Sequence, residues 1–157
     1  MLSFPPTLIL RHRKENLKKC SLKGLEKRSD CLFHTYPKDA LPSLSGYFLL
    51  TPGAQCLSYE DAALGILLID GTWRYATTMI RHLNLPQNFI KRSIPTNIST
   101  AYPRRQEEAG GLASVEALYF AYLITRRDPT GLLENYHWKD SFLEINQTVI
   151  DFFKELT

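Results

Sequence analysis

The sequence predicts a single α/β domain, in which a mostly parallel sheet is flanked by helices. Short apolar segments typical of strands alternate along the chain with segments typical of helices. The segment GILLID at 65–70 is apolar at every position from Ile66 to Ile69, as expected for a strand covered on both faces. The length of 157 residues and the hydrophobic fraction of 44% fit one domain, spanning 1–157, with its own core.

The first half of the chain is expected to contribute two strands and a short helix before the segment at 65–70. TLILRH at 7–12 and YFLLTP at 47–52 have the composition of strands, and a proline and a glycine end the second. SYEDAAL at 58–64 is typical of a short helix, because Ser58 can cap it and acidic residues occupy its first turn.

The strand at 65–70 is followed by a predicted helix at 73–83 and by a predicted strand, NFIKRSI, at 88–94. Residues 95–113 contain two prolines and two glycines, and we expect them to form a long irregular connection. A connection of that length within a compact domain indicates either a functional segment or disorder.

The C-terminal part of the chain is expected to be helical. Ser114 caps a predicted helix that runs to about Arg127, with Glu116 in its first turn. The last predicted helix spans 138–156, where apolar residues recur at spacings of three and four, so this face should lie in the core. The face consists of Trp138, Phe142, Ile145, Val149, Phe152 and Leu156.

Basic residues are concentrated near the N-terminus. The net charge is +3, but residues 11–28 hold eight basic and two acidic side chains, so this segment carries +6 and the remainder −3. Clustered cations suit a nucleic-acid backbone, because each phosphate that they neutralise releases counterions. The alternative is a solvated helix or loop face.

Composition and motif spacing exclude several classes of function. No apolar stretch approaches the roughly 18–20 residues of a membrane span, and the N-terminus lacks the features of a signal peptide. The three cysteines form no C-x-x-C pair and the four histidines have no ligand spacing, so no metal is expected. Neither a P-loop nor a dinucleotide-binding glycine motif occurs. We therefore expect a cytoplasmic location and no membrane partner.

The stretch IDGTW at 69–73 is the first candidate for a functional site. In α/β sheets, ligands bind beyond the carboxyl ends of strands, and Asp70 ends the predicted strand at 65–70. Its carboxylate would suit proton acceptance from a weakly acidic group, although it could instead cap the helix that follows. Trp73 could cover an adenine or another base, or it could belong to the core. The end of the strand at 47–52 is expected at the same edge of the sheet.

The connection at 95–113 carries a second candidate. Arg104 and Arg105 adjoin Tyr102, and two guanidinium groups beside an aromatic ring suit a flipped-out base with its flanking phosphates. The alternative is a surface loop balanced by the acidic residues that follow. The glycine pair at 110–111 leaves backbone groups uncovered, which suits hydrogen bonds to a ribose or to an adenine edge.

Several blocks of the sequence resemble two related families of RNA-modifying enzymes. DGTW followed by A and M, at 70–79, resembles the D-x-T-W signature of the DTW-domain tRNA uridine aminocarboxypropyltransferases, and GLASVEAL at 111–118 resembles the second block of that superfamily. Other blocks are similar to the opening, the L-S-P-x-x-x-x-x-S-x-x-D segment and the W-x-x-x-F-L-x-x-N close of the sister family that modifies small-subunit rRNA. These are RHRKENLKKCSLKGLE at 11–26, LLTPGAQCLSYED at 49–61 and YHWKDSFLEINQ at 136–147.

Two departures from these families accompany the likeness. The cysteine-rich start common in DTW proteins is absent, and the A-N-P-x-N-Y-G stretch of the ribosomal family appears only as SIPTNISTAYPRR at 93–105. The likeness nevertheless runs in order over nearly the whole chain. It therefore indicates the superfamily, with rRNA and tRNA both fitting as substrates.

The resemblance implies a knotted α/β fold related to the SPOUT trefoil-knot RNA methyltransferases. It implies that 51–157 is a knotted part that binds the cofactor and that the basic part at 1–50 faces RNA. It also implies an enzyme that uses S-adenosylmethionine to place a 3-amino-3-carboxypropyl group on the position-3 nitrogen of a uridine or pseudouridine. We expect this enzyme to be a monomer. Two alternatives stay open: a SPOUT-type methyltransferase with the same cofactor, and a non-catalytic RNA-binding factor in ribosome assembly.

The resemblance also assigns roles to single residues. Asp70 is the expected base, or the group that orients the uracil. Glu116 either positions the amino group of the donor or stabilises the start of its helix. The expected cofactor-binding residues are Leu50, Thr51, Pro52, Thr72, Trp73, Leu112, Ala113, Ser114 and Glu116. The expected RNA-binding residues follow instead from the clustered positive charge, and they are Arg11, Arg13, Lys14, Lys18, Lys19, Arg104 and Arg105.

Overall fold

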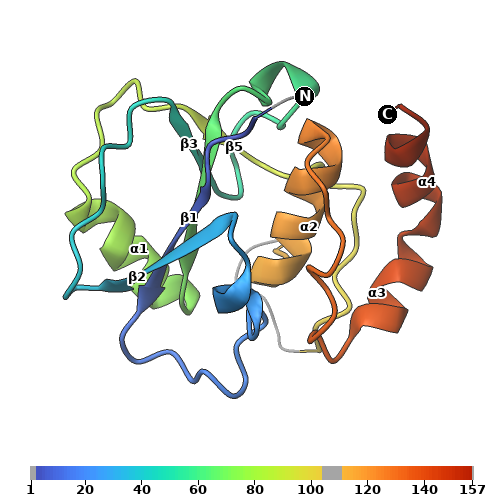
Figure 1. Ribbon diagram of the computed structural model, residues 1–157, viewed down its shortest axis with the longest axis horizontal. Helices are drawn as coiled ribbons and strands as arrows, with labels where there is room; N and C mark the ends of the chain where they lie inside the picture. Colours follow the sequence, from blue (N-terminus) through green and yellow to red (C-terminus); the bar gives the residue numbers. More distant parts are fainter. Residues whose placement is uncertain (1–2, 104–110, 157) are drawn as a thin grey trace.

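A five-stranded sheet forms the centre of the fold in a computed structural model that describes residues 3–103 and 111–156. The strand pairings are parallel, and the order across the sheet is β2–β1–β4–β3–β5 (Figure 1). The predicted α/β class with a mostly parallel sheet is thus confirmed. The strands span Thr7–His12 (β1), Cys31–Tyr36 (β2), Tyr47–Leu50 (β3), Gly65–Asp70 (β4) and Lys91–Arg92 (β5).

β1 and β4 lie at the centre of the sheet because the middle of each strand is aliphatic. All six residues of β1 and five of the six in β4 are buried. The strands predicted at 7–12 and 65–70 are therefore confirmed. In the parallel register, Arg11 lies opposite Asp70. The polar ends of two apolar strands consequently meet at the carboxyl edge of the sheet.

Other strands differ from the sequence prediction. β2, CLFHTY, was not predicted, because it lies at the edge of the sheet and its polar residues weaken the apolar pattern. The strand expected at 47–52 ends at Leu50, and the strand expected at 88–94 pairs with β3 over two residues. The helix expected at 58–64 is a single 3₁₀ turn at Tyr59–Asp61.

Helices cover both faces of the sheet (Figure 1). Helix α1, Trp73–His82, lies on one face, and α2, Ser114–Thr125, lies on the other. Helices α3, Lys139–Ile145, and α4, Gln147–Glu155, lie beyond α2, so α2 is buried between the sheet and this outer pair. In the part of the chain that the structure describes, no helix combines the length and the apolar character that crossing a membrane requires.

The single helix expected at 138–156 is divided at Asn146. The buried side chain of Asn146 donates hydrogen bonds to the carbonyls of Ser99 and Phe142 at 2.8 and 3.0 Å, and it accepts one from the N–H of Ser99 at 2.8 Å. These bonds bind the helix pair to the connection after β5 and offset α4 from α3. The predicted core face is confirmed for Phe142, which is buried, and for Trp138 and Val149, which pack against the core, but it is wrong for the rest. Its exposed members are Ile145, Phe152 and Leu156.

The basic part at 1–50 and the remainder of the chain share this sheet. β4, from the remainder of the chain, lies between β1 and β3, which both belong to 1–50, so strands from the two parts alternate at the centre. The carboxyl edge of the sheet is consequently built from both parts.

Candidate active site

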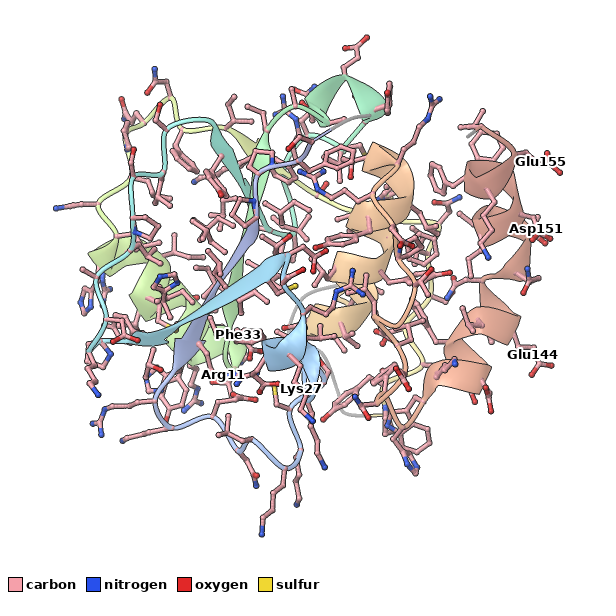
Figure 2. The ribbon with its side chains drawn as sticks, in the orientation of Figure 1. Arg11, Lys27, Phe33, Glu144, Asp151 and Glu155 are labelled. Carbon is pink, nitrogen blue, oxygen red and sulfur yellow. The ribbon has the colours of Figure 1, made fainter. Side chains whose placement is uncertain are left out.

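A buried ion pair joins β1 to β4 at the carboxyl edge of the sheet. Arg11 Nε donates to Asp70 Oδ2 at 3.1 Å, and the two side chains are only 9% and 5% exposed. The Arg11 guanidinium also pairs with Glu26 at 3.0 Å and lies 4.4 Å from the centre of the Phe33 ring (Figure 2). Burial opposes its charge, but the hydrogen bond to Glu26 and the neighbouring Asp70 raise the pKa of Arg11 above its usual range. Arg11 therefore keeps a positive charge beside Asp70.

Two further side chains fix the orientation of the Asp70 carboxylate. Cys20 Sγ donates to Oδ2 at 3.2 Å, and Ser114 Oγ donates to Oδ1 at 3.3 Å. Arg11 Nη2 in turn donates to Cys20 Sγ at 3.5 Å. Burial, followed by the negative charge of Asp70, raises the pKa of the Cys20 thiol to about 12. The thiol is therefore protonated at neutral pH and acts as a hydrogen-bond donor.

The Asp70 carboxylate borders a cavity of about 680 Å³. One wall is the turn from β4 into α1, another is the segment that leads into α2, and a third is the basic connection after β1. The volume lies within the roughly 300–1,000 Å³ that is typical of small-molecule sites. The predicted catalytic residue and five of the predicted cofactor-binding residues line it together, and the predicted RNA-binding residues Lys14 and Lys19 line it as well. The first six are Asp70, Thr72, Trp73, Leu112, Ala113 and Ser114. Lining residues to which the sequence prediction gave no site role include Arg74 and Tyr75.

The turn between β4 and α1 explains how Asp70 and Trp73 reach the same cavity. Thr72 is the N-cap of α1, since its Oγ1 accepts a hydrogen bond from the N–H of Tyr75 at 3.4 Å. The alternative in which Asp70 caps the helix is therefore wrong. Trp73 is 49% exposed, so the alternative that places its ring in the core is also wrong.

The start of α2 is held by a residue that the sequence prediction missed. The hydroxyl of Ser114 bonds to Asp70 instead of capping its own helix. Ser21 Oγ, from the basic connection, accepts the N–H of Val115 at 3.2 Å. The helix is therefore attached to the segment that also carries Cys20.

Glu116 stabilises the start of α2 and is not among the residues that line the cavity. It is completely buried. Its carboxylate accepts hydrogen bonds from the N–H groups of Ala113 and Ala101, both at 2.8 Å, from Thr100 Oγ1 at 2.6 Å and from Tyr136 OH at 3.0 Å. These donors satisfy the carboxylate, which corrects the expectation that Glu116 contacts the cofactor and favours its role at the helix start.

The predicted cofactor residues at the end of β3 do not line this cavity. Leu50 is buried in the core between the sheet and α2, and the N–H of Thr51 donates to the carbonyl of Arg92 at 2.9 Å. Pro52 is exposed. All three lie at the carboxyl end of the strand beside β4.

The predicted RNA-binding residues separate into different environments. Arg11 is buried and paired with Asp70 and Glu26, which leaves its guanidinium inaccessible to phosphates and corrects that expectation. Arg104 and Arg105 lie outside the described residues. The exposed members, on the connection between β1 and β2, are Arg13, Lys14, Lys18 and Lys19.

One cluster within the described ranges has the spacing of metal ligands. Glu15, Cys20 and Asp70 bring three possible ligand atoms within 4.8 Å of one another. Their chemistry does not suit a divalent cation, because Arg11 already contacts Asp70 and Cys20, and the raised pKa of Cys20 opposes the thiolate that a metal requires. The cluster is better described as a polar network that orients Asp70.

Cys20 and Ser21 belong to this site although the sequence prediction assigned them no role. They follow two lysines, and the charge of that run dominates its pattern. The available signal was the presence of KKCS within the block similar to the opening of the ribosomal family.

The fold and the site define a class of protein: a parallel α/β domain with a buried carboxylate beside a cavity and a basic segment above it. Residues 48–157 match the family described as ribosome biogenesis protein, C-terminal, and the chain belongs to this family.

Two relatives are similar over most of the chain. The 16S rRNA aminocarboxypropyltransferase of Methanobrevibacter smithii is 29% identical over 145 residues, which cover 88% of this chain and 81% of the relative. The structure of the SAM-dependent rRNA:acp-transferase Tsr3 from Vulcanisaeta distributa matches with a TM-score of 0.72 at 22% identity, covering 95% of this chain and 83% of that one. The structural likeness shows a shared fold.

Proposed function

We propose that this protein transfers the 3-amino-3-carboxypropyl group of S-adenosylmethionine to the position-3 nitrogen of a uridine or pseudouridine in small-subunit rRNA. The observation that carries the proposal is the buried Asp70 carboxylate, which Arg11 holds at the border of a cavity of about 680 Å³. The relative from Methanobrevibacter smithii, a 16S rRNA aminocarboxypropyltransferase, supports rRNA instead of tRNA as the acceptor.

The composition of the cavity fits S-adenosylmethionine. Trp73 and Leu112 offer an apolar wall for an adenine ring. Lys14 and Lys19 line the same cavity and suit the carboxylate of the amino-acid arm. When bound, S-adenosylmethionine supplies the aminocarboxypropyl group and leaves as methylthioadenosine.

The proposed cofactor site extends to the neighbouring strand. β3 adjoins β4, so Leu50, Thr51 and Pro52 lie at the same edge of the sheet as Asp70. We assign their apolar groups to the adenine, and main-chain groups near Thr51 and Ala113 to its polar edge. The resemblance to the SPOUT-like superfamily supports a knotted arrangement of 51–157, which stays a prediction.

Asp70 is proposed to accept the imino proton of the uracil ring. Arg11 and Cys20 occupy Oδ2, whereas Oδ1 accepts a hydrogen bond of 3.3 Å from Ser114 and has a second lone pair for the imino N–H. Removing that proton makes the ring nitrogen nucleophilic, and a positioned base typically contributes about 10²–10⁴-fold to the rate. Arg11 acts through Asp70 and is therefore a positioning residue.

The exposed basic segment after β1 is proposed to bind the RNA backbone. Arg13 and Lys18 are exposed on the connection that forms one wall of the cavity and are left for the RNA backbone when Lys14 faces the cofactor. Arg104 and Arg105 are predicted to contribute further cations. Affinity should therefore fall steeply with salt. The monomeric state and the cytoplasmic location stay predictions.

Product analysis tests the proposed function. The purified protein, S-adenosylmethionine and small-subunit rRNA from cells that lack the gene should yield methylthioadenosine and an aminocarboxypropylated nucleoside, identified by mass spectrometry. S-adenosylhomocysteine with a methylated nucleoside would instead show a methyltransferase. Failure to bind S-adenosylmethionine in calorimetry would favour a non-catalytic assembly factor, and tRNA assayed in parallel tests the choice of acceptor.

A further inference from the structure

A second cavity, of about 780 Å³, adjoins the proposed cofactor cavity. Lys19, Ser21 and Tyr102 line both cavities, so the two share a wall. We infer that the second cavity holds the nucleotide next to the target uridine in a single-stranded segment of rRNA. This inference rests on the proposed function, because it follows the RNA strand outward from that site.

One wall of the second cavity is basic. Lys18, Lys19 and Lys23 line it, and all three are exposed on the connection between β1 and β2. Ammonium groups gathered in one concave wall suit the phosphodiester that links two nucleotides. An acidic peptide would also meet lysines here, but the wall shared with the proposed uridine site favours RNA.

Another wall is aromatic. Trp138 is half-buried, and its indole stands nearly perpendicular to the His137 ring, with 4.5 Å between the ring centres and 85° between the planes. Tyr136 also lines the cavity but is buried in the core, where its hydroxyl donates to Glu116 at 3.0 Å, so the accessible rings are those of Trp138, His137 and Tyr102. Aromatic side chains of this kind stack on unpaired RNA bases whatever their sequence.

The polar lining residues orient the nucleotide. Glu134 and Asn135 also line the cavity. The Glu134 carboxylate repels a phosphate, which therefore belongs at the lysine wall, whereas a carboxylate and an amide both suit the polar edge of a base. The base consequently faces residues 134–138, and its phosphate faces residues 18–23.

The charge of the neighbouring surface limits the path of the RNA strand. Glu144, Asp151 and Glu155 project outward from α3 and α4, and all three are exposed (Figure 2). This acidic face disfavours a phosphate backbone. The strand is therefore directed along the basic connection after β1, which lies on the path from the second cavity to Asp70.

Substitution of Trp138 tests the inference, with Phe152 as the matched control. Trp138→Leu keeps an apolar side chain but removes the stacking surface, so the KM for rRNA should rise about tenfold. Phe152→Leu removes an exposed ring on α4, outside both cavities, and should leave that KM unchanged. Calorimetry should give the same affinity for S-adenosylmethionine in both variants.

The lysine wall gives a second test, which holds even if Trp138→Leu fails to fold. The double variant Lys18→Ala/Lys23→Ala should weaken rRNA binding, and the slope of log affinity against log salt should fall by about 0.7 for each lysine that contacts a phosphate. Lys91→Ala, an exposed lysine on β5, is the control.

The two proposals fail in distinguishable ways. Unchanged rRNA affinity in both the Trp138 and the lysine variants would show that the second cavity is not a nucleotide site. Weaker binding of an acidic peptide in the same variants would not rescue the inference. If these variants lose rRNA affinity while the wild-type protein releases no methylthioadenosine, the result supports the nucleotide site and contradicts the proposed transfer.

Discussion

The carboxyl and amino edges of the central sheet each hold an arginine–aspartate pair with similar hydrogen-bond partners but different burial. At the carboxyl edge, Arg11 Nε lies 3.1 Å from Asp70 Oδ2. At the amino edge, Arg28 Nε lies 2.9 Å from Asp30 Oδ1. Each carboxylate also accepts a hydrogen bond from a thiol and from a hydroxyl. These donors are Cys20 and Ser114 for Asp70, and Cys31 and Tyr122 for Asp30.

The two networks differ in what adjoins them. Asp70 borders a cavity of about 680 Å³. Arg28 instead donates to the carbonyls of Asp128 and Thr130, at 3.2 and 2.5 Å, and so binds the connection after α2 to the segment before β2. The same residue types thus support the fold at one edge and a candidate reaction at the other. The two networks therefore differ in their access to a cavity and not in the types of residue that form them.

Exchanging each carboxylate for an amide should give the largest contrast. Asp70→Asn removes the proposed proton acceptor, so transfer to rRNA should fall at least about 100-fold in single-turnover assays at saturating cofactor. Asp30→Asn changes the same group at the amino edge and should retain near wild-type transfer. Equal rates in the two variants would remove Asp70 from the chemistry.

Replacing each arginine by methionine should lower the free energy of unfolding by different amounts at the two edges. Arg11→Met leaves the Asp70 carboxylate buried without its cation and should lower the free energy of unfolding by about 3–5 kcal/mol. Arg28→Met should cost about 1 kcal/mol, because the Asp30 side chain is 43% exposed and water replaces its partner. Urea denaturation measures both values. Similar losses would show that burial does not distinguish the two pairs.

The amino-edge pair should contribute to acid sensitivity. Burial opposes ionisation of Asp30, but the hydrogen bond and charge of Arg28 outweigh it and lower the pKa of Asp30 below its usual range. The stability that this carboxylate adds is therefore present above the pKa of the unfolded chain and is lost as pH falls through the lower, folded-state pKa. Between pH 6 and pH 3, the wild-type protein should lose more unfolding free energy than Asp30→Asn. Parallel stability curves would contradict this.

The two buried thiols, one in each network, should react alike, so alkylation should give the smallest difference between the two edges. Burial is the main cause that raises the pKa of Cys20 to about 12 and that of Cys31 to about 11, whereas Cys56 is exposed. Iodoacetamide at pH 8 should therefore alkylate Cys56 in the native protein and reach the other two after unfolding. Mass spectrometry of the alkylated peptides identifies each site. Rapid labelling of native Cys20 would show that its network is open to solvent.

Local sequence patterns predicted the parts of the fold that local physics determines. The apolar runs of β1 and β4 predicted buried strands, and the rule that ligands bind beyond the carboxyl ends of strands placed Asp70 and Trp73 correctly at a cavity. Periodicity alone did not predict the break at Asn146, because that break depends on hydrogen bonds to Ser99, a residue far away in the sequence.

The composition of the site depended on contacts that no local pattern records. Arg11 has the sequence context of a phosphate-binding residue, and only the register between β1 and β4 places it against Asp70. Cys20 and Ser21 reach the site through a connection without regular secondary structure, whose course no periodicity describes. The second cavity combines that connection with residues 134–138, which lie more than a hundred positions later in the chain.

The pairing of β1 with β4 also makes the chemistry conditional on folding. Arg11 and Asp70 are 59 positions apart, and the parallel pairing of β1 with β4 brings them together. Ser114, from a still later segment, completes the carboxylate environment. The proposed site is therefore complete only when three segments far apart in the sequence have met, so a chain in which any one of them is undocked should show no transfer.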